Sequence, residues 1–120
     1  MTAQQRMATG GYGEERAAKY LSGLGMVVLD RNWRCDLGEL DLVLRDGRVL
    51  VFCEVKTRAS AAFGGPLEAV TPAKLARLRR LAARWLADHD VRPPEVRLDV
   101  VGVQLDRGGD KGVQHVRGVG

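Results

Sequence analysis

Four charged residues, three carboxylates and a lysine, interrupt two segments of this chain that are otherwise typical of buried β-strands. Glu39 and Asp41 lie in the segment 38–43, and Glu54 and Lys56 lie in the segment 51–56. Strand interiors avoid such side chains unless something compensates for their burial. Carboxylate oxygens are the ligands that hard divalent cations such as Mg²⁺ prefer. The spacing therefore predicts a divalent-metal site.

The turn between the two segments predicts which faces these residues share. Asp46-Gly47 separates the two apolar runs, and Asp-Gly is a strong signal for a two-residue hairpin loop. With that loop, Leu44 pairs with Val49, and the four charged residues project to one side, together with Val43, Leu50 and Phe52. Asp41 and Glu54 are then diagonal neighbours, with backbones roughly 7–8 Å apart. The opposite face is wholly apolar and consists of Leu40, Leu42, Leu44, Val49, Val51, Cys53 and Val55.

Two simpler explanations compete with a metal site. Charges on edge strands protect against aggregation, and Lys56 could pair with Glu54 in solvent. A loop that differs by one residue would also move Asp41 to the other face. Against these explanations stands the combination of Asp41 on one strand, Glu54-x-Lys56 on the next and apolar residues around them. Carboxylates placed this close repel one another, and a divalent cation resolves that conflict.

The series Asp41 … Glu54-Val55-Lys56 resembles the PD-(D/E)-x-K signature of the restriction-endonuclease-like nucleases, with Leu40 where the signature has proline. A longer series of blocks, from about Gly10 to Val103, is similar to the small bacterial YraN-like family. Its blocks are Gly13-Glu14, Arg31-Asn32, residues 38–43, residues 52–58, Phe63-Gly64, Lys74 and residues 97–101. The resemblance implies a restriction-endonuclease-like fold, similar to that of archaeal Holliday-junction resolvases.

The resemblance also implies roles for single residues. The expected catalytic residues are Asp41, Glu54 and Lys56, and the expected ligands of Mg²⁺ or Mn²⁺ are Glu14, Asp41, Glu54 and the Val55 carbonyl. Lys56 would orient or deprotonate a water and stabilise charge on a phosphate.

Three of the acidic residues have alternative roles. Glu14 matches the helix glutamate that approaches the metal in junction resolvases, but it also suits the dipole of a helix N-terminus. Glu39 and Asp99 either support the metal ligands or hold the sheet locally, and the sequence does not decide between these roles.

Basic side chains predict contacts with nucleic-acid phosphates. Four of them share one face of a predicted helix, because their spacings are three, three and four residues, and three others flank the proposed site. The seven residues are Arg31, Arg34, Arg58, Lys74, Arg77, Arg80 and Arg84. A solvated helix face is the ordinary alternative. The net charge of +4 and a pI near 9.5 permit a polyanionic partner without requiring one.

Hydrophobic periodicity predicts the element order α-β-β-β-α-β-β, with helices flanking a small mixed sheet in an α/β sandwich. One helix is expected from Gly11 to Leu24, ended by Gly25, and a second after Thr71 as N-cap. Residues 59–70 should form a loop, and the last strands should span residues 96–103 and 113–116.

Length and composition indicate one domain, residues 10–120, after a flexible N-terminus of residues 1–9. The hydrophobic fraction of 45% and the charged fraction of 28% are ordinary for a globular protein. We see neither a signal peptide nor an apolar run as long as a membrane span. Cys35 and Cys53 lack metal-type spacing. These features predict a reduced, cytoplasmic protein.

Two hypotheses for function follow. The first is a metal-dependent endonuclease that hydrolyses phosphodiester bonds in DNA, including branched or structured DNA, and the intact set of Asp41, Glu54 and Lys56 favours it. The alternative is a non-catalytic nucleic-acid-binding or accessory protein that retains the nuclease fold. No motif separates RNA from DNA. Oligomeric state stays open, with a homodimer as the arrangement that junction resolvases use to cut two strands.

Overall fold

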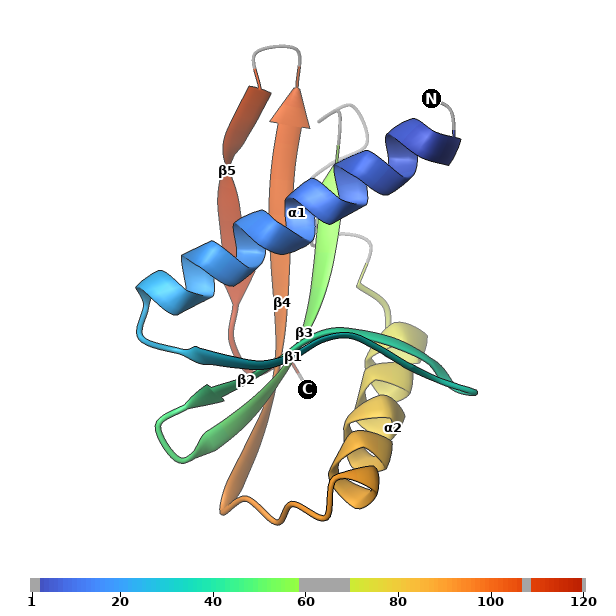
Figure 1. Ribbon diagram of the computed structural model, residues 1–120, viewed down its shortest axis with the longest axis vertical. Coiled ribbons are helices and arrows are strands. Elements are labelled where there is room, and N and C mark those ends of the chain that lie inside the picture. Colours follow the sequence, from blue (N-terminus) through green and yellow to red (C-terminus); the bar gives the residue numbers. More distant parts are fainter. Residues whose placement is uncertain (1–2, 59–69, 107–108, 120) are drawn as a thin grey trace.

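A five-stranded mixed sheet carries two helices, one on each face (Figure 1). The computed structural model describes residues 3–58, 70–106 and 109–119, with side chains at 11–58, 70–105 and 112–119. The elements are α1 (Ala3–Gly23), β1 (Val27–Cys35), β2 (Gly38–Asp46), β3 (Val49–Arg58), α2 (Pro72–Asp88), β4 (Glu95–Asp106) and β5 (Gly109–Val116). The predicted α/β class and element order are confirmed.

The strands follow one another in space as they do in sequence, in the order β1-β2-β3-β4-β5. All neighbours are antiparallel except β3 and β4, which are parallel. A parallel pair needs a long crossover, and α2 lies within it. The expected loop at 59–70 belongs to the same crossover, and its residues 59–69 lie outside the described part of the chain.

Both helices end or begin where the sequence predicts a cap. Gly25, with φ of 96°, closes α1 in a Schellman motif, because the Met26 amide donates to the Leu21 carbonyl and the Gly25 amide to that of Ser22. Thr71 caps α2 by accepting a hydrogen bond from the Lys74 amide. At its other end α1 begins at Ala3, so it includes most of the segment 1–9 that we expected to be flexible. Among the described residues, neither helix combines the length and apolar character needed to cross a membrane.

The β2–β3 hairpin has a different loop from the one predicted. Asp46 pairs with Val49, so the loop is Gly47-Arg48 instead of Asp46-Gly47. Gly47 has φ of 63°, and a positive φ at the first loop position is what a type II′ turn requires of glycine. Leu44 consequently pairs with Val51, two residues beyond the predicted Val49. A shift of two residues does not exchange the faces, so the predicted alternation survives the error over the paired residues 42–46 and 49–53.

The sheet forks at the middle of this hairpin. Pairing between β2 and β3 ends at Leu42 and Cys53. Beyond that pair β2 stays with β1 down to Gly38, while β3 stays with β4 up to Arg58. Figure 1 shows the end of the β1–β2 hairpin bending away from the far half of β3.

The fork explains one wrong prediction about the core. The α1 face of the sheet buries Leu42, Leu44, Val51 and Cys53 against Ala17, Ala18 and Leu21, as the alternation predicts. The α2 face buries Val43, Leu50 and Phe52 against Leu78, Leu81 and Trp85. Leu40 was predicted to share a face with Leu42 and Leu44, but it lies in the α2 cluster, beside Trp33 and Cys35. Because the hairpin end bends, the period of two no longer holds across Asp41.

A buried ion network fastens the C-terminal segment to the sheet. The Asp99 side chain is fully buried and accepts hydrogen bonds from Arg97 at 2.8 and 3.0 Å, from the Gly118 amide at 3.2 Å, and pairs with His115 Nε2 at 2.8 Å. Arg97 also donates to Asp46 at 3.2 Å. These contacts favour the local structural role for Asp99. Burial opposes ionisation, but the hydrogen bonds from Arg97, His115 and Gly118 outweigh it and lower the pKa of Asp99.

We expect Asp99→Asn to lower the free energy of unfolding at pH 7 by about 2–4 kcal/mol, because it removes the buried charge that pairs with Arg97 and His115 and leaves the partly buried Arg97 with Asp46 alone. A carboxylate with a lowered pKa stabilises the fold above its ordinary pKa of 3.8 and loses that effect as the pH falls through the folded value. The difference between parent and variant should therefore shrink in acid. Urea unfolding at pH 7 and below pH 4 measures it, with Asp36→Asn as the exposed control. If Asp99→Asn lost the same free energy of unfolding at both pH values, the ionised Asp99 carboxylate would not be the source of the stabilisation.

Candidate metal centre

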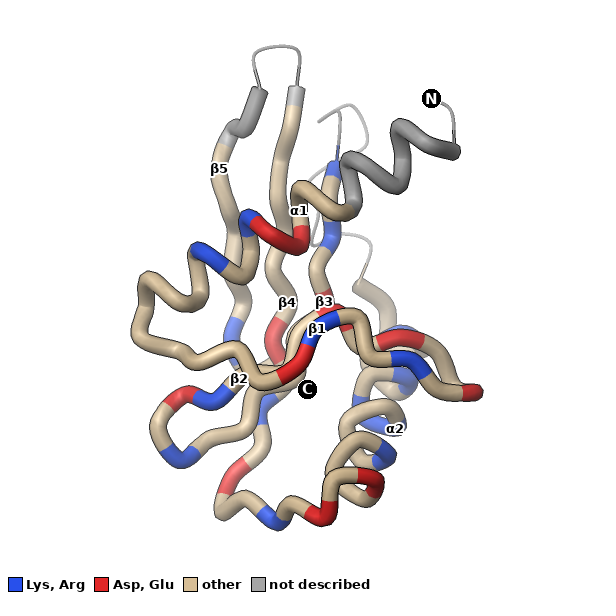
Figure 2. The backbone as a smooth tube through the Cα atoms, in the orientation of Figure 1, with Lys and Arg blue, Asp and Glu red and all other residues tan. Residues whose placement is uncertain are grey.

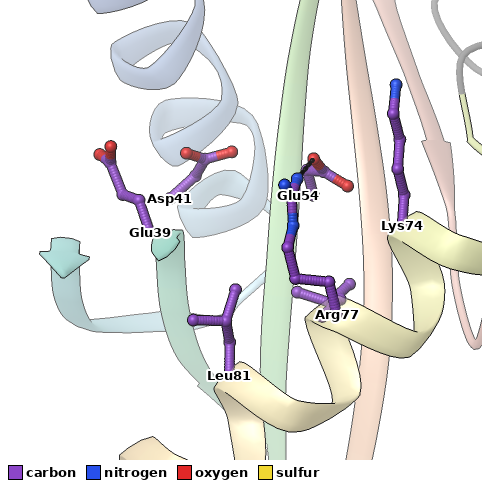
Figure 3. Close-up of a pocket in the computed structure, with 7 residues that line it drawn as sticks. Glu39, Asp41, Glu54, Lys74, Arg77 and Leu81 are labelled. Carbon is purple, nitrogen blue, oxygen red and sulfur yellow. Dashed lines mark ion pairs between the residues drawn. The ribbon is translucent and has the colours of Figure 1, made fainter. Parts of the chain in front are cut away.

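The Asp41 carboxylate lies at the fork of the sheet. Its Oδ2 accepts a hydrogen bond from the Val55 amide at 2.8 Å, where the backbone ladder between β2 and β3 has already ended. The observed register, continued by one residue, would set Asp41 opposite Glu54 instead of diagonal to it, but the ladder ends one pair earlier, at Leu42 and Cys53. Figure 3 shows both side chains in one pocket, with Glu39 beside Asp41 and with Lys74 and Arg77 entering from α2.

Three carboxylates from two elements converge here. Glu14 of α1 and Glu39 and Asp41 of β2 each offer one oxygen, and these oxygens lie within 4.8 Å of one another. Each residue is half-buried. The sequence predicted Glu14 and Asp41 as ligands and left Glu39 between two roles. The structure places Glu39 in the same group as the other two, and its Oε2 lies 3.3 Å from Arg34 Nε.

Crowding and burial raise the pKa of Asp41 from 3.8 to about 7. Burial is the largest cause, and the charges of Glu14, Glu54 and Glu39 add to it, while the Val55 hydrogen bond opposes the shift. Burial and the charge of Glu39 likewise raise the pKa of Glu14, against a hydrogen bond from Asn32 and the charge of Arg34. Without a cation, the folded chain therefore disfavours full ionisation of this group.

Asn32 is a site residue to which the sequence analysis gave no role. It sits in β1 with φ of 51°, in the left-handed region that non-glycine residues rarely adopt and that asparagine tolerates best. Its side chain hydrogen-bonds Glu14. The available signal was its place in the Arg31-Asn32 block of the family resemblance.

Glu54 occupies the other side of the pocket and is engaged with cations. Its side chain is only 13% exposed, and Oε1 lies 3.1 Å from Lys56 Nζ and 4.0 Å from Arg77 Nη2. The pairing with Lys56 was one of the two alternatives for that lysine. Glu54 faces Asp41 but is not in the group of three close carboxylates. The Val55 amide donates a hydrogen bond to Asp41. The role of the Val55 carbonyl as a metal ligand stays a prediction.

The predicted basic residues differ in their surroundings. Lys74 and Arg77 line the carboxylate pocket, and Arg80 is exposed on α2. Arg84 lies 2.8 Å from Asp36 and 3.6 Å from Asp88, and Arg31 lies 2.8 Å from Glu15, so both are neutralised locally. Arg58 is half-buried at the end of β3. Figure 2 shows basic positions along α2 and on the β1–β2 hairpin, interspersed with acidic ones.

These residues fit a hard divalent cation. Glu14, Glu39 and Asp41 supply oxygen donors, the class that Mg²⁺ and Mn²⁺ prefer, and their repulsion is relieved by a positive charge. Glu54 is near enough to add to the negative potential at this group, since its charge raises the pKa of Asp41. The two cysteines are free, and neither is in the group of three.

Residues 13–103 match the family described as "Uncharacterised protein family UPF0102". The chain belongs to this family. A UPF0102 protein of Beutenbergia cavernae is 63% identical over 113 residues, which cover 94% of this chain and 96% of the relative. UPF0102 proteins of a Nocardioides species and of Streptomyces coelicolor are each 58% identical, over 96% and 95% of this chain and 93% and 89% of theirs. The family predicted from the ordered blocks is thus confirmed, and it brings no named activity.

We expect Asp41→Asn to stabilise the metal-free protein at pH 8 by about 1–3 kcal/mol, because it removes a buried charge and keeps an acceptor for the Val55 amide. The folded pKa of about 7 lies above the ordinary 3.8, so the folded state binds this proton more tightly. Stability of the parent should consequently fall as the pH rises from about 4 to about 7, and remain low above it.

Thermal melts in EDTA at pH 4.5 and pH 8 measure this effect, and the gain from Asp41→Asn should appear at pH 8 and shrink at pH 4.5. Asp36→Asn, on an exposed side chain, is the matched control and should give no gain. A loss of stability in Asp41→Asn at pH 8 would show that the carboxylate is an ordinary structural partner.

Proposed function

We propose that this chain is a divalent-metal-dependent endonuclease that hydrolyses phosphodiester bonds in DNA, with branched or structured DNA as its substrate class. One observation carries the proposal. A group of three close carboxylates and a group of three cations, Lys56, Lys74 and Arg77, flank Glu54 at the same fork of the sheet. Carboxylates can hold a metal, and cations beside them can bind the phosphate that the metal activates.

The ligands of Mg²⁺ or Mn²⁺ would be Glu14, Asp41 and Glu54, with the Val55 carbonyl as first predicted and with Glu39 added by its position. The ion would supply Lewis-acid activation of the scissile phosphate and a more acidic water. The chain itself excludes bulk water from one side, because Leu78 and Leu81 line the pocket below the carboxylates.

Lys56 and Arg77 would bind the phosphate. Both contact the Glu54 carboxylate, so a phosphate oxygen entering between them competes for the same donors. The Lys56 ammonium would then donate a hydrogen bond to a phosphate oxygen and stabilise charge that develops there. Arg77, whose side chain is half-exposed, would bind the phosphate backbone of the same DNA strand.

Two further features belong to the proposal. A homodimer would bring two such sites to two strands of a branched substrate, and a cytoplasmic location would give access to DNA. The alternative, a nucleic-acid-binding accessory protein with the same fold, predicts binding without cleavage.

Cleavage of labelled linear, flapped and four-way DNA in Mg²⁺ or Mn²⁺ tests the proposal. We expect divalent-dependent cutting that falls at least about 100-fold in Asp41→Ala, Glu54→Ala and Lys56→Ala, since each removes a ligand or a positioned proton donor. Glu15→Ala, next to Glu14 but paired outward with Arg31, should cut like the parent. Cutting retained in all three variants would assign the activity to another site or a contaminant, and tight binding without cutting would favour the accessory protein.

Arg77 and Arg84 should have different effects on DNA affinity. Arg77→Gln should weaken binding several-fold and lower the slope of log K against log salt by about 1, because one phosphate contact releases about one counterion. Arg84→Gln should change the slope little, since Arg84 is already paired with Asp36 and Asp88. Fluorescence anisotropy across a salt series measures both. Equal slopes for the parent and Arg77→Gln would remove Arg77 from the interface.

A further inference from the structure

Gly13 lies in the middle of α1 at a point where the helix backbone touches the sheet. Gly13 is buried, and a Cβ built on it would overlap Thr57 Oγ1 and lie 3.0 Å from Thr57 Cβ and 3.3 Å from Cγ2. Thr57 is on β3, one residue after Lys56. Real Cβ atoms essentially never overlap a neighbour as this one would overlap Oγ1, and the other two contacts are tighter than most, so this approach of helix to strand strongly favours glycine.

The contact cannot be relieved cheaply. A β-branched side chain has few χ1 choices, and two of the three staggered rotamers of Thr57 put Oγ1 or Cγ2 at the crowded position. The third puts Hβ there and still leaves the Thr57 Cβ, which is fixed by the strand, 3.0 Å from the added Cβ. Any side chain at position 13 would therefore push α1 away from β3. Glycine inside a helix is destabilising relative to alanine, so the residue carries a cost that the close approach must offset.

The next residue along α1 is Glu14, one of the three close carboxylates. We propose that Gly13 is a positioning residue, which sets the depth at which Glu14 stands against Asp41 and Glu39. The proposal rests on the proposed function, in which Glu14 is a metal ligand. Ala17 and Ala18, the small buried residues of the following turn, continue the close approach along the helix.

Asn32 is a second partner of Glu14. It has a left-handed backbone conformation, and its side chain forms a hydrogen bond with the Glu14 carboxylate. The contact with Thr57 sets where the helix lies, and the contact with Asn32 sets where the carboxylate points. Movement of α1 away from β3 would carry Glu14 away from both Asn32 and Asp41.

The test compares two identical substitutions in one helix. Gly13→Ala introduces the overlap, whereas Gly11→Ala is the matched control, because a Cβ at Gly11 meets nothing within 4 Å. Gly11→Ala should raise the melting temperature by about 3–5 °C through helix propensity alone. Gly13→Ala should lower it. The double variant Gly13→Ala with Thr57→Ala, which removes Oγ1 and Cγ2, should recover part of the loss.

Two readouts separate positioning from mere packing. Asn32 is the only asparagine in the chain, so selective labelling gives a single side-chain amide signal by NMR. In the metal-free protein this signal should move in Gly13→Ala toward its position in Glu14→Ala, and stay in place in Gly11→Ala. The dissociation constant for Mn²⁺, from electron paramagnetic resonance, should rise about 10-fold or more in Gly13→Ala and recover with Thr57→Ala.

The outcomes distinguish the two proposals. An Asn32 signal that is unchanged in a folded Gly13→Ala protein would overturn the positioning role, whatever happens to metal affinity. A displaced signal with no Mn²⁺ binding by the parent would support the positioning of Glu14 and contradict the metal site. If Gly13→Ala does not fold and Thr57→Ala fails to restore it, the steric origin of the effect is wrong.

Discussion

The hydrogen bond from the Val55 amide to the Asp41 carboxylate is the contact on which the rest of the site depends. At this point β2 leaves β3, and the bond replaces the backbone ladder that ends at Leu42 and Cys53. It buries a carboxylate at the fork of the sheet and holds the two diverging strands at a fixed distance. Beyond it the β1–β2 hairpin is free to bend toward α2, which brings Leu40 into the second core.

The energetic consequence is a fold that concentrates negative charge where it is poorly solvated. Glu14 arrives from α1 through the close contact at Gly13, Glu39 arrives with the bent end of β2, and Glu54 faces them from β3. A stable core surrounds this group, since the side chains of Val43, Val51 and Phe52 are fully buried. Functional sites commonly hold such conflicts at the expense of stability, and a divalent cation is the simplest way to relieve this one.

Much of the scaffold could be predicted because it depends on local signals. Thr71 and Gly25 mark helix ends by mechanisms that act within one turn, and alternation assigned Leu42, Val51 and Phe52 to the correct faces even though the loop was misplaced. The wrong face for Leu40 and the overlooked role of Asn32 have a shared cause. Both depend on where a strand bends or adopts a left-handed residue, which is decided by packing between elements and not by spacing along one. The grouping of Glu14 with Asp41 followed from the family resemblance alone, because only the docking of α1 brings them together.

Calorimetric titration of the metal-free protein with Mn²⁺ tests the metal site without any knowledge of the substrate. We expect saturable binding at one site by the parent and by Asp36→Asn, whose carboxylate is exposed and paired with Arg84. Asp41→Asn should lose that binding although it remains folded and, without metal, is more stable. Equal Mn²⁺ binding by the parent and Asp41→Asn, or no binding by the parent, would contradict the metal site at Asp41.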